Sequence, residues 1–372
     1  MLQGKELRDT CLGSATSGMV SRLLCHPLDT AKARLQGPEG SFFRNTGHVL
    51  RTTMATEGVG GLYRGIGAVL VGGVPGMCIY LTTYEATKGF LADRAADRAG
   101  DGAPVSGGGG MLTHLTAGML AEIVCCVVYV PVDVVKERLQ VQRPSRIATP
   151  TALNHGGASG AGIGAVKDAP MRPYRGSADT LKTILRTEGL RGIYKGYLAT
   201  LASFGPFSAL YFMFYEQAKA ASQSLIERQP DRWHGGVTAP AAAAAATERG
   251  ERALERGGGR AAELPVWVTL ANAAAASAAA SWLTNPLDLA KLRLQVQRGG
   301  AAAAAATAGP TLTAAATPYS GMMDALGRSY RAGGLAGLFK GSGARMAFQA
   351  PNVAITMAAY EKSKEAWGYF LS

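Results

Sequence analysis

Apolar residues fall into six long runs along the chain, and each run ends near a cluster of charged residues. The runs form pairs, at about 10–26 and 66–91, 112–130 and 197–221, and 264–285 and 342–367. Most are long enough to cross a hydrocarbon layer of about 30 Å as a helix. Small residues are frequent in them and allow close helix packing. The pattern therefore predicts an all-α membrane protein with six transmembrane helices, and disfavours a soluble helical repeat protein.

Between the two runs of each pair, the sequence predicts a short amphipathic helix. These helices are expected at about 46–56, 177–187 and 321–331. In the second of them, Leu181, Ile184 and Leu185 share one helical face. The sequence therefore predicts three short amphipathic helices in addition to the six long ones.

Three sequence motifs recur in the same order in each pair of runs, so the chain consists of three repeats. We place the repeats at 1–111, 112–263 and 264–372. Loop insertions lengthen them at 143–173, 222–263 and 298–318. Three tandem copies predict a bundle with pseudo-threefold symmetry.

The first motif places an acid, a lysine and a glutamine after a proline, at offsets +2, +5 and +9. These offsets share one helical face, and charges at the end of a spanning helix are expected to face a water-filled interior or one another. We therefore expect each acid to reach the lysine of a neighbouring repeat, with the glutamines bridging the pairs. The ring consists of Asp29, Lys32, Gln36, Asp133, Lys136, Gln140, Asp288, Lys291 and Gln295.

The prolines of this motif, Pro27, Pro131 and Pro286, each remove a helical hydrogen bond. We expect them to act as hinges that tip the charged ends together. A structural role in which the charges only fix topology is the alternative, but it does not explain why the ring is complete.

The third motif, at the other end of each repeat, combines a tyrosine, a glutamate and a lysine. It predicts a second ionic ring, so that two rings at opposite ends of one bundle would form two gates. The second ring consists of Tyr84, Glu85, Lys88, Tyr215, Glu216, Lys219, Tyr360, Glu361 and Lys364.

The composition supports a membrane location and gives no sign of an enzyme or a nucleic-acid-binding protein. Of the 372 residues, 47% are apolar and only 17% are charged, and the net charge is +12. Such a positive excess suits an anionic membrane surface. The five cysteines have no metal-binding or redox spacing. We expect no catalytic residues, no cofactor and no metal site.

Together, the motifs resemble those of the mitochondrial carrier family of solute transporters (solute carrier family 25) over nearly the whole chain. The family pattern P-x-[DE]-x-x-[KR] fits all three copies, as does the closing [FY]-[DE]-x-x-[KR]. The second motif lies between these two, and its family pattern [DE]-G-x(4)-[YWF]-[KR]-G fits "EGVGGLYRG" (57–65) and "EGLRGIYKG" (188–196). The third copy, "GGLAGLFKG" (333–341), has Gly333 in place of the acid, so we expect it to lack one contact.

The resemblance implies six tilted helices around a pseudo-threefold axis, with both termini towards the intermembrane space. The first ring would be the matrix gate and the second the cytosolic gate, closing alternately around a central site. The family also binds cardiolipin at helix N-termini. The matching residues are Arg64, Gly65, Gly176, Lys195, Gly196, Gly321, Lys340 and Gly341.

Two unmatched charges suggest the kind of solute that is carried. Arg22 and Glu122 lie close to the helical faces of Asp29 and Asp133, but their counterparts in the other repeats are neutral. An asymmetric substrate explains such charges better than a symmetric gate does, although an Arg–Glu pair with a structural role is the alternative. A cation together with an acid suits a zwitterion, and the set has no arginine trio for a polyanionic nucleotide.

The resemblance adds the family's substrate-contact positions, which map to Gly72, to Ser203 with Phe204, and to Gln349. Arg345 is a further candidate. "VPGMCIYLTTYE" (74–85) and "GPFSALYFMFYE" (205–216) resemble the branch that contains S-adenosylmethionine carriers and glutathione- or metal-linked carriers. An amino-acid derivative such as S-adenosylmethionine is therefore the expected substrate.

Two alternatives remain for this fold: a glutathione- or metal-linked carrier, and a proton-leak or non-transporting protein. The resemblance implies a multi-pass protein of the mitochondrial inner membrane, with another organelle such as the peroxisome as the alternative. The expected partners are a small-molecule solute, cardiolipin and bilayer lipid, with no nucleic acid, and the protein is expected to be a monomer.

Overall fold

The computed structural model describes residues 4–38, 40–99, 111–142, 174–228, 264–297 and 318–370. Most of the predicted insertions, at 143–173, 229–263 and 298–317, lie outside the described residues. Within the described residues the secondary structure is helical, and there is no strand.

Each repeat contributes two long helices, as the six apolar runs predict. Repeat 1 has α1 (Gly4–Gln36) and α4 (Ile66–Ala99), and repeat 2 has α5 (Met111–Val141) and α8 (Tyr197–Arg228). Repeat 3 has α10 (Val266–Leu283), continued by α11 (Asn285–Val296), and then α14 (Ser342–Phe370). The assignment of 222–228 to a loop was wrong, because α8 continues to Arg228.

Short helices lie at one end of the long ones, close to their expected positions. They are η1 (Gly40–Phe42), α2 (Thr46–Glu57), α3 (Val59–Leu62), α6 (Ser177–Thr187), α7 (Gly189–Ile193) and α13 (Met322–Leu338). Gly58, Gly189 and Gly334 turn the chain with φ of 68°, 66° and 59°. This left-handed conformation favours glycine, which explains the glycine that follows the acid position of the second motif.

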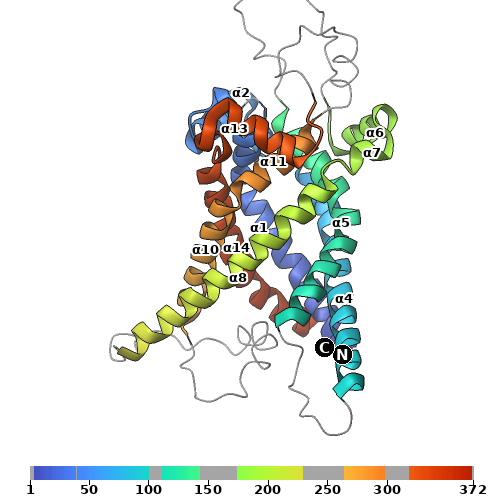
Figure 1. The fold of residues 1–372 in the computed structure, drawn as a ribbon, viewed down its shortest axis with the longest axis vertical. Coiled ribbons are helices and arrows are strands. Elements are labelled where there is room, and N and C mark those ends of the chain that lie inside the picture. The colour runs from blue at the N-terminus through green and yellow to red at the C-terminus, as the bar shows by residue number, and fades with distance from the viewer. Residues whose placement is uncertain are drawn as a thin grey trace, which may run out of the picture.

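The long helices contact one another in chain order, and α14 closes the ring by packing along α1. In Figure 1 they form a barrel, with the short helices at its upper end and both chain termini at the lower end. The seam between α14 and α1 includes a hydrogen bond of 2.8 Å from Ser21 Oγ to Asn352 O. A closed ring gives every long helix two neighbours.

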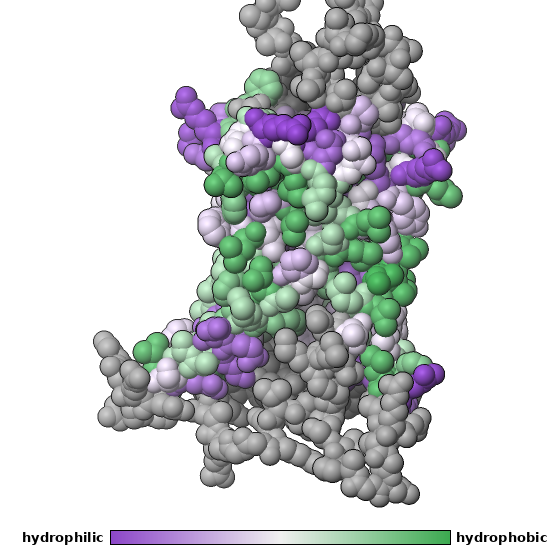
Figure 2. Space-filling model, viewed as in Figure 1, coloured by the Kyte–Doolittle hydropathy of each residue, from purple (hydrophilic) through white to green (hydrophobic). Residues whose placement is uncertain are grey.

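An apolar belt surrounds the barrel between polar ends, as Figure 2 shows. Exposed apolar residues such as Val71 and Leu198 belong to this surface. Four described helical segments are long and apolar enough to cross a membrane: Val59–Leu91, Thr116–Val141, Gly189–Ile226 and Val266–Leu283. α1 and α14 are equally suited in length but more polar, and their Arg22 and Arg345 lie at an internal cavity and in the interior.

The three motif prolines are accommodated in two ways. Pro27 and Pro131 lie inside continuous helices. In repeat 3 the helix is divided at Thr284, and Pro286 stands in the first turn of α11, where a missing N–H is tolerated. The position is therefore shared, but only repeat 3 interrupts its helix there.

Candidate functional site

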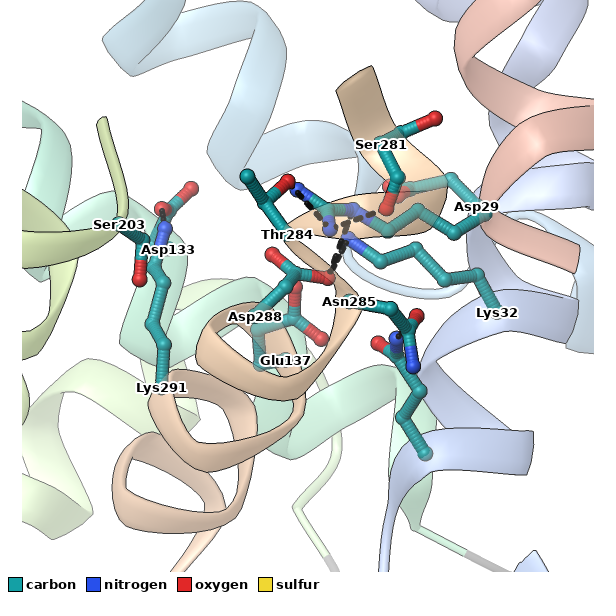
Figure 3. Close-up of polar contacts among 12 residues, drawn as sticks. Asp29, Lys32, Asp133, Glu137, Ser203, Ser281, Thr284, Asn285, Asp288 and Lys291 are labelled. Carbon is teal, nitrogen blue, oxygen red and sulfur yellow. Dashed lines mark hydrogen bonds and ion pairs between the residues drawn. The ribbon is translucent and has the colours of Figure 1, made fainter. Parts of the chain in front are cut away.

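At the end of the barrel that carries the short helices, six charged side chains form a closed ring of three ion pairs. Lys136 Nζ lies 2.7 Å from Asp29 Oδ2, and Lys291 Nζ lies 2.9 Å from Asp133 Oδ2. Lys32 Nζ completes the ring at 2.8 Å from Asp288 Oδ2. Figure 3 shows the pairs formed by Lys291 and Lys32. Every pair joins two different repeats, so the ring ties all three together.

The three pairs differ in their exposure to solvent. The side chains of Lys136 and Asp29 are only 6% and 4% exposed, whereas those of Lys291 and Asp133 are 19% and 21% exposed. Water therefore screens the attraction within the first pair less, although both of its charges have also lost more hydration. The ring is therefore symmetric in sequence but not in exposure to solvent.

The glutamines of the motif do not bridge all three pairs, which corrects the expectation for Gln36 and Gln295. Gln140 Nε2 donates to Asp29 Oδ2 and to Thr30 Oγ1, both at 3.2 Å. Gln36 Nε2 instead donates to Asn285 Oδ1 at 3.0 Å. Gln295 Nε2 is buried and meets no acceptor among the described residues. Only the pair of Asp29 is braced in the expected way.

Arg345, expected among the substrate contacts, is a member of this network. Its Nε lies 3.3 Å from Asp288 Oδ2, beside Lys32. Its Nη1 donates to Ser281 O at 2.7 Å and to Thr284 Oγ1 at 3.0 Å, where the helix of repeat 3 is interrupted. The guanidinium is thus bound by the protein itself in the closed ring, and its contact with a substrate stays a prediction.

A second layer of arginines, which the sequence analysis missed, lies directly outside the ring. Arg34 binds Glu57 with both terminal nitrogens, at 2.6 and 3.0 Å, and Arg138 binds Glu188 in the same way, at 2.5 and 2.9 Å. Arg293 meets no acid among the described residues and donates to Ser329 Oγ at 2.7 Å. The recurrence of an arginine seven residues after each motif proline was the available signal.

These arginines also join neighbouring repeats through the backbone. Each donates from Nε to the carbonyl oxygen of the motif glutamine in the next repeat, at 3.0, 3.0 and 3.4 Å. The donors and acceptors are Arg34 and Gln140, Arg138 and Gln295, and Arg293 and Gln36. Gly333, at the acid position, explains why the third arginine lacks the carboxylate that the other two bind.

A cavity opens directly onto the ring and is lined mostly by charged side chains. Besides the six ring members, its wall includes Arg22, Glu137, Leu292, Gln295 and Phe348. Glu137 was not anticipated, because the corresponding residues of the other repeats are Ala33 and Leu292. The cavity therefore contains one cation and one acid outside the symmetric pattern.

Arg22 and Glu122, the two unmatched charges, are both partly buried. Arg22 lines the cavity next to the ring. Glu122 Oε1 accepts a hydrogen bond of 3.3 Å from Cys126 Sγ. One charge thus lies at the cavity, and the other lies more than two helical turns before Asp133 on α5.

The other expected substrate contacts have mixed surroundings. Ser203 is buried and donates to Ala199 O of its own helix at 2.7 Å, while Phe204 and Gln349 are partly buried. Gly72 faces α5, and a Cβ there would overlap Val132. Gly72 therefore allows α4 and α5 to approach closely, so we leave it out of the proposed binding site.

The second ionic ring is described only in part, because the side chains of Glu361 and Lys364 lie outside the described residues. Tyr84, Glu85, Lys88, Tyr215, Lys219 and Tyr360 are partly buried, and Glu216 is exposed. Tyr84 stacks on Tyr80 and Tyr215 on Tyr211, with ring centroids 6.3 and 6.1 Å apart. Aromatic rings therefore line up along α4 and α8 in this region.

The glycines predicted to bind lipid lie where the short helices meet the long ones. Gly65, Gly196 and Gly341 immediately precede α4, α8 and α14, with φ of 83°, 83° and 77°. A Cβ at Gly65 would crowd the backbone of Lys136. Gly176 and Gly321 cap the N-termini of α6 and α13 with extended backbone. These positions leave helix N-termini without a side chain over them.

The cations next to these glycines are used differently in the three repeats. Arg64 Nη1 donates to Gln142 O at 3.0 Å, and Lys195 Nζ donates to Gln297 O at 3.2 Å. No ion pair or hydrogen bond joins Lys340 to another described side chain. Burial lowers the pKa of Lys340, and the nearby Arg293 guanidinium lowers it further.

Comparison with known proteins identifies the family. The family profile described as "Mitochondrial carrier protein" matches three times, at residues 4–95, 108–224 and 262–370. The chain belongs to the mitochondrial carrier family. Members of this family are transporters and not enzymes, so the ring and the cavity belong to a solute carrier.

Curated relatives of this carrier cover nearly its whole length. It is 30% identical over 355 residues to "Mitochondrial substrate carrier family protein E" of Dictyostelium discoideum, covering 95% of this chain and 94% of the relative. It is 26% identical to the "Mitochondrial S-adenosylmethionine carrier protein" of Xenopus tropicalis, covering 97% of each. It is also 26% identical to "Mitoferrin" of Dictyostelium discoideum, covering 95% of this chain and 92% of the relative.

Proposed function

We propose that this carrier moves a small zwitterionic amino-acid derivative across the mitochondrial inner membrane by alternating access. The observation that carries the proposal is the closed ring of ion pairs between repeats, with a charged cavity directly next to it. The ring is the matrix gate, and the tyrosine-containing ring at the other end of the barrel is the cytosolic gate.

The strength of the ring suits a gate that opens repeatedly. A solvent-exposed ion pair contributes about 0–1 kcal/mol, and a buried pair gains less than Coulomb attraction suggests because both charges lose water. A substrate that binds the opening state more tightly than the closed one offsets the loss of these pairs. Pro27, Pro131 and Pro286 are hinges about which the charged helix ends separate.

Arg22 and Glu122 are the residues that distinguish the substrate. The Arg22 guanidinium suits a carboxylate, which it can bind with two parallel hydrogen bonds. Glu122 suits an ammonium or sulfonium group, and it lies on α5 while Arg22 lies on α1. Ser203, Phe204 and Gln349 complete the binding site. A molecule that carries both charges would bridge the two helices.

S-adenosylmethionine meets this requirement, since it has a carboxylate, an ammonium and a sulfonium group. The similarity to S-adenosylmethionine carriers supports this substrate. The similarity to mitoferrin supports the second candidate, a metal-linked or glutathione-linked carrier. A proton-leak protein without a solute is the third, and the same experiment distinguishes them.

Cardiolipin is proposed to bind where the short helices meet the long ones, with the protein working as a monomer. Its phosphates would accept hydrogen bonds from free N–H groups at the starts of α4, α8 and α14, and of α6 and α13. Arg64, Lys195 and Lys340 supply positive charge beside these sites.

The test of the substrate combines thermal unfolding with transport. The purified protein with cardiolipin is unfolded in the presence of S-adenosylmethionine, glutathione, ATP or a divalent metal, since a ligand of the folded state raises the melting temperature. We expect S-adenosylmethionine alone to raise it, and to exchange across proteoliposomes that contain the protein. Arg22→Ala and Glu122→Ala should abolish both effects.

Arg51→Ala is the matched control, because Arg51 is exposed on α2 and away from the cavity. It should retain the shift and the exchange. A shift by glutathione or a metal instead would replace the substrate with the second candidate, and a shift by ATP alone would contradict the zwitterion. Proton conductance without exchange of any solute would favour the leak.

A further inference from the structure

Glu137 lies in the closed ring but has no lysine of its own. Its Oε1 is 3.5 Å from Lys136 Nζ, whereas the same nitrogen is 2.7 Å from Asp29 Oδ2. Its Oε2 is buried, and no hydrogen-bond donor among the described residues reaches it. The whole residue is only 7% exposed, yet it lines the cavity. Figure 3 shows its carboxyl group among the charged side chains.

Except for Arg22, the other charged side chains around this cavity are already paired with one another. Each of the three lysines has an acid within 2.9 Å, and Arg345 lies against Asp288. Lys136 and Lys32 attract a negative charge on Glu137, but Asp29 and Asp133 repel it. The charged groups that face the cavity or its ring come from α1 (Arg22, Asp29, Lys32), α5 (Asp133, Lys136), α11 (Asp288, Lys291) and α14 (Arg345).

A carboxylate in this position is costly, because one of its oxygens has lost water and gained no donor. A neutral carboxyl group lowers that cost, because burying a neutral O–H costs much less than burying a charge. Its O–H can remain at Oε2, the oxygen without a partner among the described residues, while Oε1 stays near Lys136. The geometry of the closed ring therefore favours the protonated side chain.

Glu137 is not needed for the ring to close. The equivalent positions in repeats 1 and 3 hold Ala33 and Leu292, which are buried at 1% and 3% exposure. The ion pairs of those repeats form beside an apolar side chain. An extra acid in one repeat of a symmetric gate therefore serves something other than closure.

We propose that Glu137 is a proton-binding site that couples proton movement to the opening of the matrix gate. This inference rests on the proposed gate function. Glu137 takes up a proton from the cavity while the matrix gate is closed. When the gate opens, Lys136 separates from Asp29 and becomes available to Glu137, and water reaches the carboxyl group. The O–H bond then breaks, its electron pair stays on the carboxylate, and the proton passes to water on the matrix side.

The first measurement needs no substrate. Infrared spectra of the purified protein in cardiolipin-containing liposomes at neutral pH report the C=O stretch of protonated carboxyl groups. We expect this band to decrease in Glu137→Gln and Glu137→Leu, and to persist in Glu137→Asp, which keeps a carboxyl group. The leucine variant reproduces the residue found in repeat 3, so it is expected to fold. An unchanged band in the glutamine variant would overturn the proposal.

The second measurement compares exchange with gradient-driven uptake in proteoliposomes. Labelled S-adenosylmethionine is offered to liposomes that contain the unlabelled compound at equal pH, and to empty liposomes that are more acidic outside. We expect the gradient to raise net uptake several-fold in the wild type. Glu137→Gln and Glu137→Leu should keep the exchange but lose the response to the gradient, and Glu137→Asp should recover part of it.

The two readouts separate this proposal from the proposed substrate. Absence of exchange in the wild type would reject S-adenosylmethionine, while the infrared band would still decide whether Glu137 holds a proton. Exchange with an equal gradient response in the wild type and Glu137→Gln would overturn proton coupling and leave the carrier function standing.

Discussion

Repeats 1 and 2 place an acid between two cations directly outside the ion-pair ring, whereas repeat 3 has the cations without the acid. Glu57 lies between Arg34 and Arg64, at 2.6 and 3.1 Å. Glu188 is bound by Arg138, and it also attracts Lys195. In repeat 3, Arg293 and Lys340 repel each other. The ion-pair ring is thus closed in all three repeats although the contacts of the arginine layer differ between them.

The largest difference is expected when the arginine itself is removed. Arg138→Ala removes the guanidinium that binds both oxygens of Glu188, whose side chain is only 8% exposed. Breaking such a buried pair costs about 3–5 kcal/mol. Among the described residues, Arg293→Ala loses one neutral side-chain partner and one carbonyl contact, and should cost about 1–2 kcal/mol. Thermal unfolding of the two purified variants with cardiolipin measures the contrast. Equal losses of stability in the two variants would mean that Glu188 does not strengthen the contacts of Arg138.

A smaller contrast is expected between the motif glutamines. Gln140 donates to Asp29 and Thr30, so Gln140→Ala should lower the free energy of unfolding by about 1–2 kcal/mol. Gln295 makes no such contact with the described residues of the ring, and Gln295→Ala should cost less. Chemical unfolding under conditions in which both variants bind cardiolipin would measure both values. A larger loss for Gln295→Ala would contradict the unequal bracing of the ring.

The smallest effect is expected when the missing acid is restored. Gly333→Glu would place a carboxylate near Arg293 and Lys340. Gly333 is exposed, and a Cβ at this position would have no described atom within 4 Å, so the longer side chain has room. We expect stabilisation by about 1 kcal/mol that decreases at high salt, measured by thermal unfolding at two salt concentrations.

Gly333→Gln is the control for this substitution, because it changes helix propensity in the same way without adding a charge. A glutamine variant that is equally stabilised would show that the gain comes from the backbone alone.

The sequence predicted the ring because its residues share one helical face. Asp29 and Lys32 are one turn apart, and the repeats supply their partners by symmetry. Arg34 lies only two residues beyond Lys32 but on nearly the opposite face of the helix. The pattern of cavity-facing residues therefore does not predict its contacts. Its partner Glu57 belongs to α2, and that contact depends on how a short helix packs against α1.

Arg345 and Glu137 were harder to place for a different reason. Both are departures from the repeat: Val69 and Thr200 stand at the positions equivalent to Arg345, and Ala33 and Leu292 at those of Glu137. The symmetry of the repeats predicts contacts that all three share, but it does not predict the contacts of a residue that occurs in one repeat alone. Arg345 reaches Asp288 because repeat 3 interrupts its helix at Thr284, whose hydroxyl accepts from the guanidinium.

The direction of pairing around the ring has a consequence for assembly of the barrel during membrane insertion. Asp29 with Lys136, and Asp133 with Lys291, join repeats that follow each other, but Asp288 with Lys32 joins the last repeat to the first. Lys32 of α1 has no partner in the ring until α11 brings in Asp288. Ser21 of α1 lacks the acceptors that Asn352 offers until α14 is in place. Unsatisfied polar groups are costly in lipid. α14 is thus the helix that closes the barrel, and a chain that stops before it would leave α1 and α10 each without one neighbour.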